Sequence, residues 1–162
     1  MKKILLLIAL LCVSYSVNAQ SSKTDNFDGD IVINNQIKLG DTIQEVVQAF
    51  GQPDSVASEY WDIPEVTATY YYYANGAEFY FVHQKLDSFL LKKSNYILSL
   101  DSIQLRVGNS IHSLQNIFPK SYSNRSANGA VITLGPPDAD HLYIDISTNS
   151  GGLITEIDIR VF

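Results

Sequence analysis

Apolar residues recur at helical spacing in two runs, residues 43–50 and 111–118. A glycine and two potential capping side chains precede each run, in Gly40-Asp41-Thr42 and in Gly108-Asn109-Ser110. We expect a glycine to end the first helix and Pro119 to end the second. Helices this short are marginal on their own, so each one predicts a sheet that covers its apolar stripe.

Segments typical of β-strands follow each predicted helix. Asn75-Gly76 separates two of them and is a strong signal for a hairpin. The expected strands are 56–63, 66–73, 77–82 and 86–91 in the first part of the chain, and 131–134, 142–146 and 153–161 in the second. Each part is therefore predicted to be a helix followed by an antiparallel meander.

An internal repeat relates the two parts. Residues 36–43 and 104–111 align at an offset of 68 positions, and every aligned pair is identical or chemically close. Such a repeat indicates a duplicated half-domain. We expect an α+β fold in which two tandem helix-then-meander repeats form one sheet, with the short helices packed on one face. The expected division is a signal peptide 1–19, a flexible leader 20–30, a first half 31–100 and a second half 101–162.

The predicted hairpin also assigns side chains to faces. A two-residue turn would place Tyr72 opposite Phe79 and Tyr73 opposite Glu78. The face that holds Tyr73 and Glu78 is amphipathic, and tyrosine is enriched at protein interfaces. The candidate partner-binding residues are therefore Tyr71, Tyr73, Glu78 and Tyr80, and Tyr60 and Trp61 are candidates to extend this surface. The alternative is that these tyrosines reflect strand propensity and cross-strand packing, with no partner.

The first residues predict export. Two lysines precede the apolar run Ile4–Val13, and Val17-Asn18-Ala19 has the small residues of a cleavage site. The run is too short to span a bilayer, and no later stretch is longer, so we expect no membrane span. Cys12 is the only cysteine, and Leu11 precedes it where a lipidation motif has a small residue. We therefore expect a periplasmic or extracellular protein without a lipid anchor at Cys12.

Charge narrows the choice of partner. The sequence has 11 basic and 17 acidic residues, a net charge of −6. Removing residues 1–19 would leave 9 basic residues against 17 acidic ones, a net charge of −8. An acidic chain lacks the basic surface that nucleic acids require. A protein partner that is basic or neutral fits better.

No pattern in the sequence predicts a catalytic centre, a cofactor or a metal. The three histidines, His83, His112 and His141, have no metal-binding spacing, and there is no nucleophile elbow or glycine-rich phosphate loop. Glu156 and Asp158 are expected on one outward face, with Asp145 beside them. They allow a hard-cation site or, alternatively, a solvated polar face that Arg160 partly neutralises.

One segment resembles a known family. Gly40-Asp41-Thr42-x-x-Glu45-Val46-x-x-x-Phe50-Gly51-x-Pro53 resembles the helix signature of the small outer-membrane lipoproteins of the barrel-assembly machinery. The tandem arrangement is similar to the β-lactamase inhibitor protein superfamily. The sequence Val-Asn-Ala-Gln, at the end of the predicted signal peptide, resembles the signal peptides common in Bacteroidetes. These resemblances imply an envelope or external protein that binds other proteins and catalyses nothing. In the inhibitor, the target is bound on the sheet face turned away from the helices.

The chain departs from both groups, because its predicted mature form has no cysteine for disulfides and it has no clear lipidation motif. The sequence therefore predicts an exported, non-catalytic protein-binding module whose partner docks on the sheet face away from the helices. An envelope structural or assembly component without one dominant interface is the alternative. A small hydrolase is a third class, and it would require a deep pocket with a perturbed acid or base.

Overall fold

The computed structural model describes residues 23–62, 65–136 and 142–161 and shows two β-sheets. The expected signal peptide lies outside the described residues, as does His141. The large sheet has the order β1 (Asn26–Phe27), β10 (Gly129–Leu134), β11 (Leu142–Thr148), β12 (Ile154–Val161), β7 (Lys85–Leu91), β6 (Ala77–Val82), β5 (Val66–Tyr73), β4 (Ser55–Trp61). The small sheet has the order β3 (Ile37–Lys38), β2 (Ile31–Ile33), β8 (Leu98–Leu100), β9 (Ile103–Leu105).

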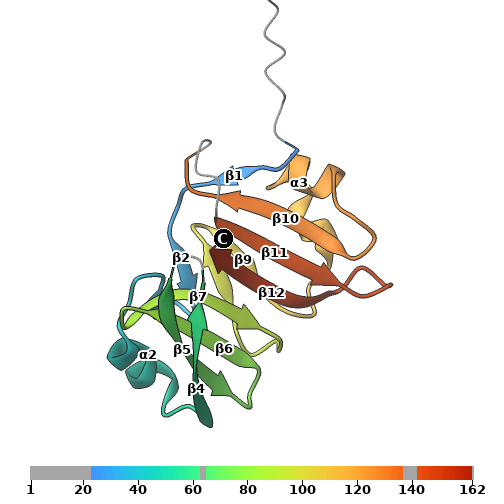
Figure 1. The fold of residues 1–162 in the computed structure, drawn as a ribbon. Coiled ribbons are helices and arrows are strands. Elements are labelled where there is room, and N and C mark those ends of the chain that lie inside the picture. The colour runs from blue at the N-terminus through green and yellow to red at the C-terminus, as the bar shows by residue number, and fades with distance from the viewer. Residues whose placement is uncertain (1–22, 63–64, 137–141, 162) are drawn as a thin grey trace, which may run out of the picture.

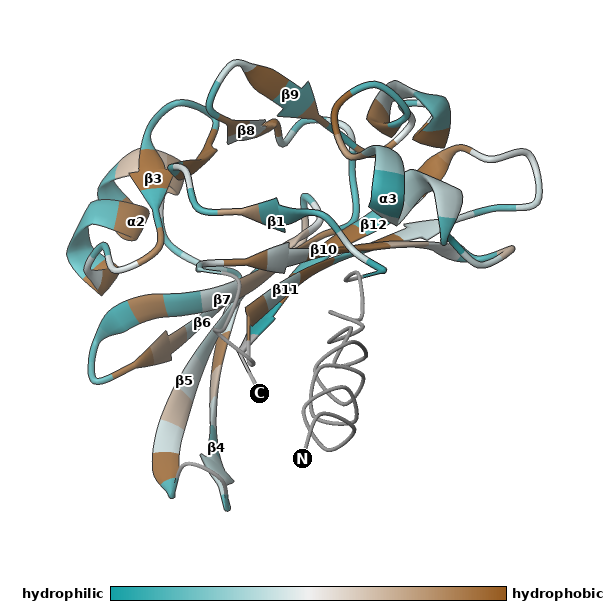
Figure 2. Cartoon of the chain, turned by 90° about the horizontal axis from the view of Figure 1, so that it is seen from above, coloured by the Kyte–Doolittle hydropathy of each residue, from teal (hydrophilic) through white to brown (hydrophobic). Residues whose placement is uncertain are grey.

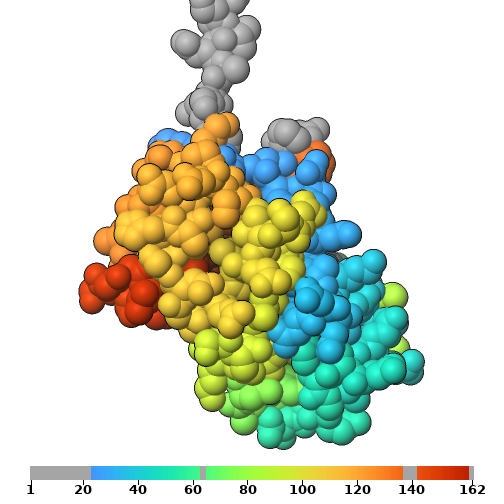
Figure 3. All heavy atoms as spheres, turned by 180° about the vertical axis from the view of Figure 1, so that it is seen from behind, coloured from blue at the N-terminus to red at the C-terminus, as the bar shows by residue number. Residues whose placement is uncertain are grey.

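The small sheet and the helical segments cover one face of the large sheet (Figures 1 and 2). The helical segments are α2 (Ile43–Phe50), the 3₁₀ turn η1 (Ile111–Leu114) and α3 (Pro119–Ser123). Figure 3 views the molecule from this covered side, where α2, β8–β9 and α3 form the surface. The hydrophobic core lies between the layers, and its fully buried members include Phe79, Phe89 and Leu98. We call the two sides of the large sheet the core face and the outer face.

The expected α+β fold is wrong. Strands dominate the described residues, and the α-helices found there have only eight and five residues. The short segments before each helix, which the sequence pattern left without assignment, pair into the second sheet. The second predicted helix shortens to the single turn η1, and Pro119 begins α3 instead of ending a helix. Proline suits the first helical position, because the amide it lacks would have no intrahelical partner there.

Helix α2 forms as the sequence predicts. The Thr42 hydroxyl accepts from the backbone amide of Glu45, whose carboxylate in turn accepts from the Thr42 amide at 2.7 Å. This capping box satisfies two helix-end donors. The hydrogen bonds that the Glu45 carboxylate accepts from the Thr42 amide and hydroxyl lower the pKa of Glu45. Val46 is fully buried, and Phe50 stacks on Phe79 with ring centroids 5.3 Å apart.

The sequence repeat has a counterpart in the topology. The first half contributes four consecutive antiparallel strands, β4 to β7, and the second half contributes three, β10 to β12. The last strands of the two halves, β7 and β12, are neighbours in the large sheet. Two backbone hydrogen bonds recur at the same offset of 68 residues: Gly40 N to Leu86 O and Leu86 N to Asp41 O, both at 2.7 Å, and Gly108 N to Ile154 O and Ile154 N to Asn109 O, both at 2.8 Å. The offset makes Leu90 the equivalent of Asp158, and these two residues pair directly across β7 and β12.

The hairpin between β5 and β6 has a different register from the expected one. Both strands have the predicted bounds, but the closing pair is Tyr73 with Ala77, which leaves a three-residue loop. Gly76 in that loop has φ of 97°, the left-handed conformation that such loops use. A shift of one position reverses which side chains share a face. Tyr71 therefore pairs with Phe79 on the core face, and Tyr72 pairs with Glu78 on the outer face.

Part of the expected flexible leader is a strand. Asn26–Phe27 form β1, which pairs in parallel with β10 at the edge of the large sheet. Phe27 is buried, and its ring meets the edge of Phe118 at 6.2 Å between centroids. Among the described residues, none of the helices has the length and apolar character needed to cross a bilayer.

Candidate functional site

The outer face carries a cluster of aromatic side chains near one end of the large sheet. Trp61, Tyr70, Tyr72 and Tyr80 are all half-buried, although no second layer of the described chain covers this face (Figure 2). They share the face because Tyr70 pairs with Tyr80 and because alternate residues of β5 point the same way. We call these four residues the aromatic cluster.

Hydrogen bonds to carboxylates hold two tyrosines of the aromatic cluster in place. The Trp61 indole donates to the Tyr70 hydroxyl at 2.6 Å, and that hydroxyl donates to Glu59 at 2.7 Å. The Tyr80 hydroxyl donates to Glu78 at 2.8 Å. Burial, followed by these carboxylates, raises the pKa of both tyrosines, so both are protonated donors at neutral pH. Lys92 pairs with Glu78 at 2.6 Å from the exposed side.

Three rings of the aromatic cluster, those of Trp61, Tyr70 and Tyr80, line an open pocket of about 260 Å³. Trp61 meets Tyr70 at 90° with centroids 6.2 Å apart, and Tyr70 meets Tyr80 at 79° and 4.9 Å. The pocket is lined by Trp61, Tyr70, Tyr80, Ser88, Leu90, Asp158, Ile159 and Arg160. It therefore combines ring walls from β4, β5 and β6 with a floor of mixed polar and apolar residues from β7 and β12. We call it the aromatic pocket.

Asp158 is the charged group of the aromatic pocket floor. It is only 4% exposed, because it lies mid-sheet between Leu90 on β7 and Asp145 on β11. Arg160, two residues along the same strand, forms an ion pair with it. Burial raises the pKa of Asp158, and the hydrogen bond from Arg160 opposes that rise.

Replacing Asp158 with leucine, the equivalent residue in the first half, is expected to raise the free energy of unfolding. The gain at about pH 7 is about 1–2 kcal/mol, because a buried ion pair is often no better than an apolar residue and Arg160 remains solvated. The folded-state pKa of Asp158 is raised, so its buried charge lowers the free energy of unfolding when the pH is above that pKa. This destabilisation disappears as the pH falls through the pKa and the carboxylate takes up a proton.

The advantage of Asp158→Leu in thermal unfolding should therefore shrink between about pH 7 and about pH 4. An advantage that grows on acidification would contradict the raised pKa. Asp28→Leu, a change at an exposed loop carboxylate, is the matched control.

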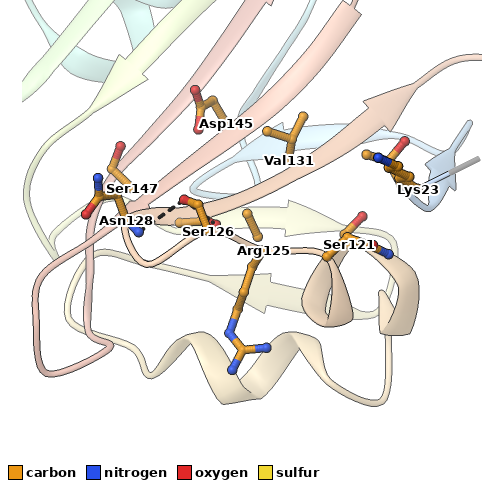
Figure 4. Close-up of a pocket in the computed structure, with 12 residues that line it drawn as sticks. Lys23, Ser121, Arg125, Ser126, Asn128, Val131, Asp145 and Ser147 are labelled. Atoms are coloured by element: carbon orange, nitrogen blue, oxygen red, sulfur yellow. Dashed lines mark hydrogen bonds between the residues drawn. The ribbon is translucent and has the colours of Figure 1, made fainter.

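A larger hollow of about 530 Å³ lies beside β10 and α3 (Figure 4). Its lining comes from the segment before β1, from α3 and the turn after it, and from β10 and β11. Polar side chains line it without converging: in Figure 4 the Arg125 guanidinium points away from Asp145, and it lies over the Tyr122 ring at 3.9 Å. A third, smaller pocket, lined by Val131, Tyr143, Asp145 and Arg160, shares residues with both. The hollows therefore follow one another across the sheet.

The sequence-predicted site residues divide between the two faces. Glu78 and Tyr80 lie on the outer face beside the aromatic pocket. Tyr71 and Tyr73 lie on the core face, because the loop is one residue longer than expected. Trp61 extends the outer surface as one of the two candidates, whereas Tyr60 points to the other side of β4 and is 59% exposed.

Sequence reasoning missed Tyr70 and Tyr72 as surface residues and missed the burial of Asp158. The order Ile-Asp-Ile in β12 signals an outward aspartate, and it lies outward as predicted. Nothing local to the sequence shows that β7 and β12 become neighbours and enclose it. Within the described ranges, no three His, Asp or Glu side chains are grouped to hold a metal ion.

No protein-family model matches the chain, and no curated protein or solved structure is significantly similar to it.

Proposed function

We propose that the chain is an exported, non-catalytic protein-binding module whose partner docks on the outer face of the large sheet. The observation that carries this proposal is the aromatic cluster, which is only half-buried on a face that no other described layer covers. Rings that combine a large apolar body with a polar edge are the side chains most enriched at the energetic centres of interfaces. Export is supported by the composition of residues 1–19.

The shape of the outer face supports a partner that makes extended contact. The aromatic pocket continues through Arg160 into the smaller pocket, and Asp145 joins that pocket to the large hollow. A protein segment lying across the strands would fill these hollows in turn. The hydrogen bonds of Tyr70 and Tyr80 fix their rings before binding, and this lowers the entropy cost of docking.

The charge of the outer face favours a basic partner. Its carboxylates are Glu59, Glu78, Asp145, Glu156 and Asp158, whereas its cations are Arg160 and Lys92, which pairs with Glu78. This imbalance has the same sign as the net charge of −6 for the whole chain. Electrostatic complementarity with a positive surface would raise the association rate and select against acidic proteins and nucleic acids.

The double variant Tyr70→Ser and Tyr72→Ser is expected to weaken partner capture by at least about 30-fold, because central aromatic contacts each contribute about 2 kcal/mol or more. The measurement is affinity purification of residues 20–162 from envelope extracts, followed by titration with the isolated partner. The matched control is Tyr60→Ser, which removes an exposed tyrosine on the other side of β4 and outside the aromatic cluster.

The native chain and the control should recover one stoichiometric partner, and the double variant should not. Recovery of the partner by a well-folded double variant would overturn the proposed surface. Diffuse recovery of many proteins would instead favour an envelope component without a dominant interface.

A further inference from the structure

We infer that the aromatic pocket receives a cationic side chain, arginine or lysine, from the partner protein. This inference rests on the proposed function and specifies the chemistry at the centre of the interface. Three features of the outer face support it: the ring arrangement, the two adjacent carboxylates and the position of Arg160.

The three rings that line the aromatic pocket do not lie in one plane. Trp61 and Tyr80 each lie nearly perpendicular to Tyr70, at 90° and 79°. Walls at right angles present ring faces and edges to a compact group from several sides. A cation within about 6 Å of such faces is attracted by the ring quadrupole, most strongly by tryptophan. The Tyr70 and Tyr80 hydroxyls already donate hydrogen bonds to carboxylates. A ligand would therefore contact the ring surfaces of these two residues.

Two carboxylates lie at the floor of the aromatic pocket and directly beside it, because Asp158 lines this pocket and Asp145 lines the smaller pocket next to it. Asp145 and Asp158 pair directly across β11 and β12, which is an unfavourable arrangement for like charges. Arg160 is the cation beside them and forms its ion pair with Asp158. A second cation at this position would relieve the repulsion, and the rings would supply its remaining contacts.

Arg160 lies between the aromatic pocket and the smaller pocket that contains Asp145, and it lines both. Its side chain is 54% exposed, so it can change rotamer without disturbing the core. We expect Arg160 to move towards Asp145 when the partner's cation pairs with Asp158. Each carboxylate would then have its own cation.

A glycan is the competing ligand for an aromatic surface with carboxylates. Sugar rings stack on flat, open aromatic faces and need free hydrogen-bonding groups around them. Here the rings of Tyr70 and Tyr80 are nearly perpendicular. The Tyr70 hydroxyl is hydrogen-bonded to Glu59, and the Tyr80 hydroxyl is hydrogen-bonded to Glu78. The geometry therefore favours a cation.

Trp61 is the only tryptophan in the sequence and lines the aromatic pocket, so its fluorescence reports occupancy directly. The test titrates residues 20–162 with the capped peptides Gly-Ser-Arg-Ser-Gly and Gly-Ser-Lys-Ser-Gly. The control peptide has glutamine at the central position. At least one cationic peptide should cause a saturable change with an affinity at least about tenfold above that of the glutamine peptide, and added salt should weaken it.

Two variants locate the binding. Asp158→Leu should weaken binding of the cationic peptide by at least about tenfold without lowering the melting temperature. The control Asp28→Leu should leave the peptide affinity unchanged. Arg160→Gln, a change at an exposed side chain, should strengthen binding several-fold because the competing cation is gone. Equal binding of the glutamine peptide, or affinity that is unchanged in both pocket variants, would overturn the inference.

A response of Trp61 to cellohexaose but to neither cationic peptide would also overturn it and would assign a glycan site. The proposed function is tested separately by partner capture. If Tyr70→Ser with Tyr72→Ser abolishes capture while Asp158→Leu retains it and no cationic peptide binds, the docking surface stands and the cation pocket fails. If capture is independent of Tyr70 and Tyr72, the proposed function fails and this inference fails with it.

Discussion

Replacing Tyr73 with alanine is expected to lower the free energy of unfolding by about 3–4 kcal/mol, whereas the same change at its neighbour Tyr72 should cost less than about 1 kcal/mol. Tyr73 is 6% exposed, and its ring meets Phe50 and Phe79 edge-on. Its hydroxyl donates to the Gly51 carbonyl oxygen at 2.9 Å. Truncation removes these contacts and leaves a cavity in the core. Tyr72 lies on the outer face and loses little that water cannot replace.

Denaturant unfolding of both variants measures this difference, and circular dichroism checks that each retains its strands. The burial that protects Tyr73 also raises its pKa to about 12. Its hydroxyl should therefore ionise only at a pH well above the usual range for tyrosine, when followed by ultraviolet absorbance in the native chain. A greater loss of stability at Tyr72 than at Tyr73 would contradict this register. It would indicate a two-residue turn, with Tyr72 on the core face and Tyr73 on the outer face.

Gly129→Ala is expected to lower the free energy of unfolding by about 3 kcal/mol or more, because strain and overpacking act together. Gly129 has φ of 151°, and a Cβ placed there would lie 1.9 Å from the backbone oxygen of Ile146. That oxygen belongs to β11, so the conflict cannot be relieved by a side-chain rotation. The hairpin of β10 and β11, which positions Asp145, would have to separate locally.

Gly108→Ala is the matched control for Gly129→Ala. Gly108 also has positive φ, at 92°, but nothing lies within 4 Å of its added Cβ. Its cost should be about 1 kcal/mol, from backbone strain alone. The difference in thermal unfolding between the two variants isolates the close approach of the two strands. Similar melting temperatures for both would show that the contact between Gly129 and Ile146 is absent.

Apart from the two-residue strand β1, the strands of the large sheet were predictable because each is long enough to show alternation or a turn signal. Those at 66–73 and 77–82 have the expected bounds. The small sheet was not predictable, because its strands have only two or three residues. Its central pair, Ile31–Ile33 with Leu98–Leu100, depends on contacts between segments far apart in the sequence.

The candidate site was partly predictable from the tyrosine-rich hairpin. Glu78 and Tyr80 lie on the outer face, and Trp61 joins them. Local sequence could not decide the positions of Tyr71 and Tyr73, because a dipeptide that favours tight turns is compatible with a loop of two or three residues. The role of Asp158 depends on the pairing of β7 with β12, which closes the two halves against each other.

The most direct test of the docking surface is ¹⁹F NMR of residues 20–162 labelled with 5-fluorotryptophan. Trp61 is the only tryptophan, so the labelled chain has a single reporter, and it lies on the outer face. Titration with the purified partner should shift or broaden this signal until one equivalent has been added. An unchanged signal, under conditions in which size-exclusion chromatography shows a complete complex, would contradict docking on the outer face.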